Sequence, residues 1–440
     1  MLQSLARRIT TRSIMTSELK RVPIPRKGVD YRGKIVLAPM VRSGELPSRL
    51  LALHYGADLV WGPETVDRAM IGTTRQYNPE TKTIDWVKKP SQGAKIPEGV
   101  KIRDNIIFRT HAEREAGKLI FQIGTSSPEY AVQAARLVAA DVVGIDVNAG
   151  CPKSFSTHDG MGAALLQTPD KLCAILEALV ADIVPEFEIG ISVKIRILET
   201  ADKTEALVRR LVATGITGLT VHCRTTPMRP REAAIRGQLR MIANICREAG
   251  VACLANGDVA NRDHALQLMS EFGTDGAMIA TAAETNPSCF RPGGTLAPWT
   301  EVIEQYLAYA MEVENKMGNT KYLLGQLIPG KQPAYKLMSA AKSYARFCEA
   351  FGFEHLMERA REVDYALDIV PEGAGKSGSV APATGSRKAN TAALAAGGRN
   401  AESRAVQHAS TRRSLSERGV SAHASSGEST AAAAAAAISV

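Results

Sequence analysis

Short apolar runs recur along the chain, and longer stretches of mixed character separate them. Each run has six to nine residues, which is short for a helix and typical of a buried strand. The stretches between them, such as 169–183 and 262–273, carry apolar residues at helical spacing. The pattern therefore predicts eight strands, at 34–39, 57–62, 118–124, 142–148, 189–197, 218–223, 251–257 and 276–281.

Eight strands that alternate with helices over roughly 250 residues predict an α/β fold of the TIM (β/α)8 barrel type. A Rossmann sheet is the alternative, but no G-x-G-x-x-G pattern follows the first strand. A long polar stretch at 74–104 interrupts the rhythm and indicates an inserted loop or a small hairpin. After Pro298 the pattern is purely helical, so we predict a barrel at 31–296 and a smaller all-helical domain at 297–370.

The two ends of the chain differ in composition from this folded part. Residues 1–30 contain three early arginines and no acid before Glu18, which fits a mitochondrial transit peptide or a frayed basic terminus. Met15 offers a second start that would omit the arginines. Residues 371–440 are rich in Ala, Gly and Ser, which predicts a disordered tail. We expect a cytoplasmic protein, with mitochondrial or nuclear copies as alternatives.

The formal charge of +9 suggests a polyanionic partner, but most of that charge lies at the ends. Residues 1–34 carry a net +7 and residues 371–440 a net +4, which leaves −2 for the rest. Only a local basic cluster can therefore argue for nucleic acid. The seven cysteines form no C-x-x-C pair, and we expect reduced thiols in a cell interior. The sequence predicts neither a metal site nor a membrane span.

Polar side chains stand at the carboxyl ends of the predicted strands, which meet at one mouth of a TIM barrel. They contain no carboxylate pair of the glycosidase type. Their amide, lysine and histidine groups suit a polar heterocycle, and the glycines let backbone approach a phosphate. A flavin mononucleotide (FMN) would fill such a site. The candidates are Pro39, Met40, Val41, Gln122, Asn148, Lys194, Arg196, His222, Asn256, Gly257, Asp258, Ala280 and Thr281.

Cys151 lies in DVNAGCPKSF, just past the fourth predicted strand. Asn148, Gly150 and Pro152 turn the strand end into a rigid loop, where parallel α/β enzymes place reactive groups. The ordinary interpretation of an isolated cysteine is a small buried hydrophobe. The turn at the barrel mouth favours a catalytic role instead.

Several long segments of the folded part match a known pattern. They are LAPMVRSGELPSRLLALHYGADLVWGPE, FRT with FQIGTSSPE, DVNAGCPKSFSTHDGMGAALL, SVKIRIL, TVHCRT, ANGDV and NTKYLLGQL. Together they resemble the flavin-dependent tRNA-dihydrouridine synthases, within them the eukaryotic branch that acts on position 20 of the D-loop. The resemblance runs from about Ile35 to Phe353 and is most specific from NAGCPK through GMGAALL. As in fungal members, no double-stranded-RNA-binding module is expected after the helical domain.

The resemblance implies roles for these residues. Gln122 and Lys194 would contact the flavin ring, Cys151 would be the catalytic proton donor, and NADPH (or NADH) would be the reductant. Pro39 to Val41 would line the flavin and His222 would also contact the cofactor, while 256–258 with Ala280 and Thr281 would approach the phosphate. At position 281 the family usually has an arginine, and its replacement by threonine removes a charge-assisted phosphate contact.

Contact with tRNA is predicted for the loop CRTTPMRPREAAIRGQLR, after the sixth strand. Its five arginines, which face one acid, are Arg224, Arg229, Arg231, Arg236 and Arg240. A solvated loop would have the same composition. We assign Asn148, Arg196, Arg224, Arg229 and Arg231 to the substrate, and expect a second basic patch at Lys331, Lys336, Lys342 and Arg346.

Two other functions remain open at this point. One is a flavin barrel that acts on a free pyrimidine, which would need neither the arginine-rich loop nor the helical domain. The other is a tRNA-binding chaperone with weakened redox activity, which Thr281 makes conceivable. Whichever function applies, we expect the protein to be a monomer.

Overall fold

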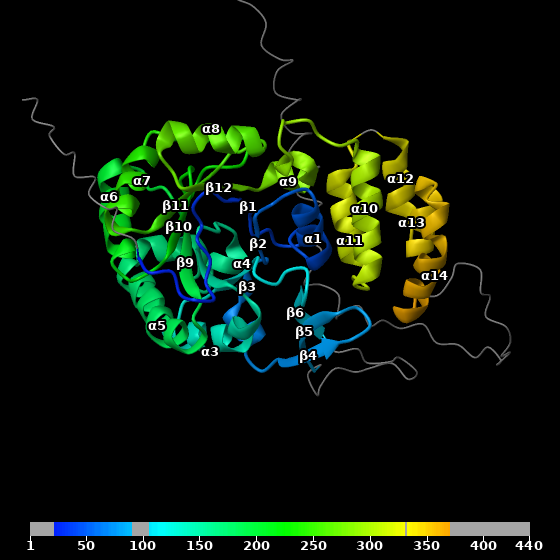
Figure 1. Ribbon diagram of the computed structural model, residues 1–440, viewed down its shortest axis with the longest axis horizontal. Helices are drawn as coiled ribbons and strands as arrows, with labels where there is room; N and C mark the ends of the chain where they lie inside the picture. The colour runs from blue at the N-terminus through cyan, green and yellow to red at the C-terminus, as the bar shows by residue number, and fades with distance from the viewer. Residues whose placement is uncertain (1–21, 90–104, 331, 370–440) are drawn as a thin grey trace, which may run out of the picture. The chain divides into compact units, whose positions relative to one another are not determined.

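Eight parallel strands close into a barrel in the computed structural model, which describes residues 22–89, 105–330 and 332–369. The ring closes because β2 pairs with β7 as well as with β1. Each strand overlaps one predicted run, so the TIM barrel is confirmed (Figure 1). The strands are β1 (Ile35–Leu37), β2 (Leu59–Trp61), β7 (Leu119–Gly124), β8 (Gly144–Ala149), β9 (Gly190–Arg196), β10 (Gly218–His222), β11 (Ala252–Asn256) and β12 (Gly276–Ile279).

Helices follow the strands and cover the outside of the barrel (Figure 1). The long helices are α1 (Leu46–His54), α3 (Pro128–Val138), α5 (Pro169–Phe187), α6 (Ala201–Val212), α7 (Leu239–Ala249) and α8 (Arg262–Phe272). Three of these barrel helices, α3, α6 and α8, are preceded by a capping residue whose side chain accepts a hydrogen bond from a backbone N–H of the first turn. The capping residues are Ser127, Thr200 and Asn261. Shorter turns are α2 (Asp67–Met70), α4 (Ser154–Thr157), α9 (Thr281–Thr285), η1 (Ala139–Asp141), η2 (Gly162–Gln167) and η3 (Pro287–Phe290).

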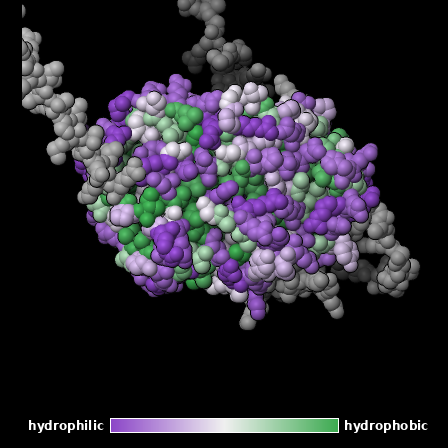
Figure 2. Space-filling view, viewed as in Figure 1, coloured by the Kyte–Doolittle hydropathy of each residue, from purple (hydrophilic) through white to green (hydrophobic). Residues whose placement is uncertain are grey.

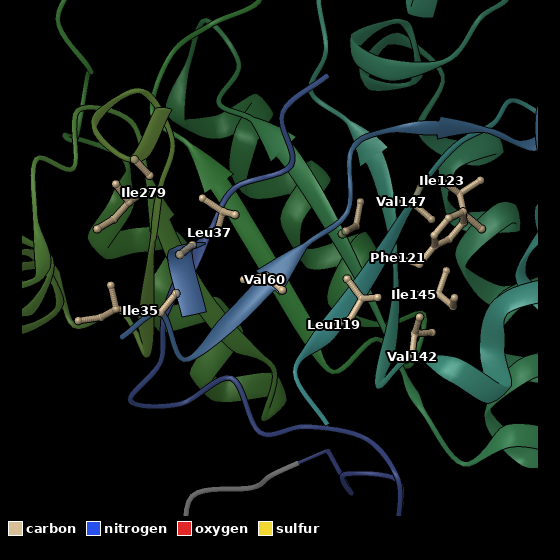
Figure 3. Packing of buried hydrophobic residues seen from close by; sticks show 14 of the residues in the cluster. Ile35, Leu37, Val60, Leu119, Phe121, Ile123, Val142, Ile145, Val147 and Ile279 are labelled. Carbon is tan, nitrogen blue, oxygen red and sulfur yellow. The ribbon is translucent and has the colours of Figure 1, made fainter. Parts of the chain in front are cut away.

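Side chains of the barrel strands alternate between two environments. Ile35, Leu37 and Phe121 belong to the large core between strands and helices, with the neighbours drawn in Figure 3. The residues next to them along the strands face inward. Of these, Val36 and Ile120 pack around Tyr31 in a second core. On β7, β9, β10 and β11 the inward positions near the carboxyl end are polar, which places a hydrophilic layer above the apolar core; they are Gln122, Lys194, His222 and Asn256.

The polar stretch after β2 contributes to a three-stranded antiparallel sheet rather than to a loop. Its strands are β4 (Thr74–Asn78), β5 (Thr83–Lys88) and β6 (Asn105–His111), and a short β3 (Thr65–Val66) pairs with β7. The small sheet packs on the barrel through aromatic rings, because Phe108 lies 5.6 Å from Trp86 and 4.7 Å from Phe121, measured between ring centroids. The predicted hairpin therefore gains a third strand, which lies beyond the polar stretch.

The C-terminal part is helical, as predicted, with α10 (Trp299–Glu312), α11 (Met317–Leu327), α12 (Pro333–Ala340), α13 (Tyr344–Phe351), η4 (Glu354–Leu356) and α14 (Met357–Ala366). Helix α10 packs on α1, and Val313 joins Leu46 and Leu50 in a small apolar cluster. On the face shown in Figure 2, hydrophobic residues gather mainly over the barrel, and the helical part is mostly hydrophilic.

Several predicted features lie outside the described residues, namely the arginine-rich N-terminus with Met15, the tail at 371–440 and Lys331. The predicted domain boundary at 297 stays a prediction. Among the helices that the structure describes, none has both the length and the apolar character to cross a membrane.

Candidate active site

A cavity of about 350 Å³ opens at the carboxyl ends of the barrel strands. Five of the barrel strands and the segments that follow the other three contribute to its wall. Glu64, after β2, and Tyr322, in the helical part, were not predicted. A second cavity of about 300 Å³ adjoins it and adds Gly257 and Asp258. The predicted residues that line the first are Pro39, Met40, Val41, Gln122, Asn148, Cys151, Lys194, Arg196, His222, Asn256, Ala280 and Thr281.

Cys151 stands on a turn whose backbone is held from three sides. The side-chain oxygen of Asn148 accepts hydrogen bonds from the N–H groups of Gly150 and Cys151, at 2.9 and 3.0 Å. The Cys151 carbonyl accepts one from the N–H of Ala163, at 2.9 Å. Gly162 allows this approach, because its φ is +57° and a Cβ there would lie 2.6 Å from the Cys151 carbonyl oxygen. The half-buried thiol is therefore fixed at the cavity edge.

A ladder of buried polar side chains connects this turn to the barrel interior. Gln122 donates to a carboxylate oxygen of Asp146, at 2.8 Å, and accepts from the side-chain nitrogen of Asn148, at 3.3 Å. Ser192 donates to the other Asp146 oxygen, at 2.7 Å. These bonds fix which end of the Gln122 amide is oxygen. Asp146 and Ser192 were missed, although their inward positions on β8 and β9 follow from the strand alternation.

Burial and positive charge together set the protonation of the cavity wall. Burial lowers the pKa of Lys194 to about 8, and Arg196 acts in the same direction, so the amine is still mostly protonated at neutral pH. Burial, with the charges of Lys194, Arg196 and Arg224, lowers the pKa of His222 to about 2. Nε2 of this neutral ring lies 3.2 Å from an Arg224 nitrogen, which can only donate. The proton of His222 is therefore on Nδ1.

The arginine-rich loop contains two kinds of arginine, those bonded to the protein itself and those exposed to solvent. Arg224 is only 5% exposed and donates to the carbonyls of Pro230 and Glu232 and to Asp258. Arg236 donates to the carbonyl of Gly257, at 2.8 Å. Both hold the loop on the barrel, and Arg224 also lines the second cavity, so its predicted contact with the substrate stays a prediction.

Arg229 and Arg231 are exposed on the same loop and line neither cavity. In the described part of the chain, neither guanidinium donates a hydrogen bond. Their assignment to the substrate therefore stays a prediction, as does the second patch, of which Lys336, Lys342 and Arg346 are exposed.

Arg196 lines both cavities, but part of its guanidinium is bound to the protein itself. It donates to the carbonyl of Gly150, at 2.6 Å, and to that of Thr225, at 3.1 Å. The first bond braces the Cys151 turn from the side of β9. Arg196 thus has a structural role that the sequence did not indicate, and its predicted substrate contact stays open.

The family model for dihydrouridine synthase (Dus) matches residues 36–372. The chain belongs to this family. It is 48% identical over 345 residues to the tRNA-dihydrouridine(20) synthase [NAD(P)+] of Schizosaccharomyces pombe, a match that covers 77% of this chain and 69% of that protein. It is 45% identical over 323 residues to the Saccharomyces cerevisiae protein of the same name, covering 72% and 82%. The S. cerevisiae tRNA-dihydrouridine(20a/20b) synthase [NAD(P)+] is 28% identical over 277 residues, covering 63% and 66%.

The two adjoining cavities of this Dus protein fit an FMN molecule. Gln122 and Lys194 offer amide and ammonium groups to the polar edge of a flavin ring. Gly257 lets backbone line the second cavity, because its φ is +110° and a Cβ there would lie 3.2 Å from the His222 ring. Helix α9 begins beside Thr281 without a side-chain cap, which leaves the N–H groups of its first turn for an anion. Asp258 is turned away, toward Arg224 and the N–H of Ala234.

Thr281→Arg is expected to tighten FMN binding about tenfold or more, if the phosphate lies beside α9. A hydrogen bond to a charged group contributes roughly 1.5–3 kcal/mol, and threonine provides no charge there. Fluorescence titration of the apoprotein with FMN measures the change. The control is Thr285→Arg, one turn further along α9, where Thr285 lines neither cavity. Equal FMN affinity in the Thr281→Arg and unmodified proteins would place the phosphate elsewhere.

Proposed function

We propose that this protein reduces the C5–C6 double bond of a uridine in tRNA to 5,6-dihydrouridine, with FMN and NAD(P)H. The observation that carries the proposal is the position of Cys151, fixed on its turn in the cavity that Gln122 and Lys194 also line. Bound FMN supplies the hydride, which it takes from NADPH or NADH. The residues of the chain supply the binding site, the orientation of the uracil and the proton.

Cys151 acts as the general acid in this proposal. Addition of hydride to one carbon of the uracil double bond leaves its neighbour in need of a proton, which the thiol provides. Burial, followed by the charge of Glu64, raises the pKa of Cys151, so the thiol stays protonated through neutral pH. Because the uridine lies within a folded tRNA, it must be flipped out to enter the cavity.

The target position follows from the relatives. Identity is 48% and 45% to two proteins named for position 20, but 28% to one named for positions 20a and 20b. We therefore assign position 20 of the D-loop to this chain. Mapping dihydrouridine across the tRNAs of a strain that lacks this protein tests the assignment, since loss at another D-loop position would contradict it.

We further propose that the enzyme works as a monomer and without a metal. Among the described residues no group of three or more His, Cys, Asp or Glu side chains is suited to hold an ion. Sedimentation of the purified protein together with metal analysis tests both points. A dimer, or a stoichiometric metal required for turnover, would contradict them.

The tRNA is expected to contact the exposed arginines of the loop after β10. Changing Arg229 and Arg231 together to Gln should weaken tRNA binding and make its salt dependence shallower, by roughly 0.7–0.9 in log–log slope for each phosphate that is no longer neutralised. Flavin reduction by NADPH should be unchanged. Arg236 is left intact, because its bond to the carbonyl of Gly257 holds the loop in place.

Exposed arginines on the outer helices provide the matched control for this double variant. Arg136 on α3 and Arg209 on α6 changed together to Gln remove the same charge from the outer wall of the barrel, away from the loop after β10. Filter binding at several salt concentrations compares the two double variants. If both bind tRNA equally weakly, the effect is one of overall charge and the loop is not the contact surface.

The two alternative functions receive less support. Tyr322 of α11 lines the cavity, and the guanidinium carbon of Arg42 lies 4.0 Å from the centre of its ring, so the helical part contributes to the mouth. A free pyrimidine needs no such extension. A chaperone with weakened redox activity has no use for a fixed thiol beside Lys194. Comparable turnover of free uridine and tRNA would favour the first alternative, and purified protein without a flavin spectrum would favour the second.

A further inference from the structure

Glu64, three residues after the end of β2, is a half-buried carboxylate in the same cavity as Cys151. One of its oxygens, Oε1, accepts a hydrogen bond from the hydroxyl of Ser156, at 2.8 Å, in the loop that follows Cys151. The other oxygen, Oε2, is buried and has no hydrogen-bond partner among the described residues. A buried polar atom without a partner costs free energy, so its presence in a cavity points to a role there.

The barrel makes room for this carboxylate at one particular position. A Cβ at residue 124 would lie 2.7 Å from Oε1 of Glu64, so the glycine at the end of β7 is needed for Glu64 to take its place. Together with the bond to Ser156, this packing anchors the side chain against the Cys151 loop. The carboxylate is therefore held in the cavity between the end of β7 and the loop after β8.

The charged groups that face Cys151 are mostly cations. Lys153 belongs to its own loop, while Lys194 and Arg196 reach it from β9. All three favour the thiolate, which cannot donate a proton. The two carboxylates of the cavity wall are Glu64 and Glu284, and Glu284 is hydrogen-bonded to the hydroxyl of Ser43. Glu64 is thus the acid placed to oppose these cations at the thiol.

We propose that Glu64 is a positioning residue that keeps the Cys151 thiol protonated, and therefore able to act as a proton donor, against the three surrounding cations. This inference rests on the proposed function, because only a general acid needs its proton at working pH. The effect of Glu64 on the thiol agrees with it, because after burial the charge of Glu64 is the main cause of the raised pKa of Cys151. Burial is the main cause of the raised pKa of Glu64, whereas Ser156, Cys151 and Lys153 act in the opposite direction and favour its charged form.

Alkylation of Cys151 by iodoacetamide tests the inference without any need for turnover. Only the thiolate reacts, and the other six cysteines are buried, so mass spectrometry can follow Cys151 as a function of pH. In Glu64→Gln the pH midpoint of alkylation should fall by about one unit, which corresponds to up to about tenfold faster labelling below the midpoint. The alkaline limit of dihydrouridine formation should fall by the same amount.

Two further variants give the test its controls. Glu64→Asp keeps the charge on a shorter side chain, so its alkylation midpoint should lie near that of the unmodified protein. If Glu64→Gln fails to fold, Glu64→Asp alone decides: a fall of its midpoint by about one full pH unit overturns the proposal. Glu284→Gln removes the other carboxylate of the wall and should leave the alkylation midpoint unmoved. An unchanged midpoint in folded Glu64→Gln also overturns it. If the unmodified protein forms no dihydrouridine while Glu64→Gln still lowers the midpoint, the proposed function fails and the effect of Glu64 on the thiol stands.

Discussion

Cys151→Ala is expected to reduce dihydrouridine formation by about 10²–10⁴-fold, the usual contribution of a general acid. The loss should be confined to the proton step. The hydrogen bonds that hold the turn come from backbone N–H and carbonyl groups of residue 151, which alanine retains. Flavin content and the rate of flavin reduction by NADPH should therefore be unchanged, and these are measured by absorbance beside dihydrouridine in the tRNA product.

A second cysteine of the chain provides the control for this substitution. Cys173 on α5 is also a free thiol, but it is buried outside the cavity, so Cys173→Ala should leave dihydrouridine formation unchanged. Cys151→Ser should also be impaired, because a serine hydroxyl is a much weaker acid than a thiol. Near-normal turnover in Cys151→Ala would remove this residue from the mechanism and assign the proton to another group or to water.

The barrel could be predicted because its strands have a strong local signature. In KLIFQIG, for example, every residue of the strand is buried, on one side against helices and on the other inside the barrel, so the run is apolar almost throughout. The three-stranded insertion has no such signature. The first of its strands, β4, is exposed over nearly its whole length, and nothing in TRQYN distinguishes an exposed strand from a loop.

The candidate site could be predicted only as far as the rule of strand ends reaches. That rule places Gln122, Lys194 and His222 at one mouth, and the structure brings them into one cavity. The same rule, applied to WGPE after the second strand, would also have found Glu64. It could not separate Arg224 from Arg229, because partners such as the carbonyls of Pro230 and Glu232 depend on how the loop folds back on itself.

Arg49 illustrates a signal of another kind, a charged residue within an apolar helix. In LPSRLLALH the residues on both sides of Arg49 are buried, and Arg49 itself is 1% exposed. Its guanidinium pairs with Glu115, at 2.6 and 2.9 Å, and donates to the carbonyls of Gly44 and Arg109. The pair therefore ties α1 both to the chain after β6 and to the segment that leads into the cavity wall.

Arg49→Met is expected to lower the free energy of unfolding by about 3–5 kcal/mol, because it leaves the carboxylate of Glu115 buried without its partner. Urea denaturation measures the loss. Arg209→Met is the control, since its ion pair with Glu205 is exposed and its removal should leave the unfolding midpoint unchanged. The double variant Arg49→Met, Glu115→Gln removes the unpaired charge and should recover part of the stability. The remaining loss then comes from the carbonyls of Gly44 and Arg109 left without donors and from the altered hydrogen bonds of Thr110 and His111 to residue 115. If Arg49→Met unfolds at the midpoint of the unmodified protein, the pair contributes nothing net and α1 is held by its apolar contacts alone.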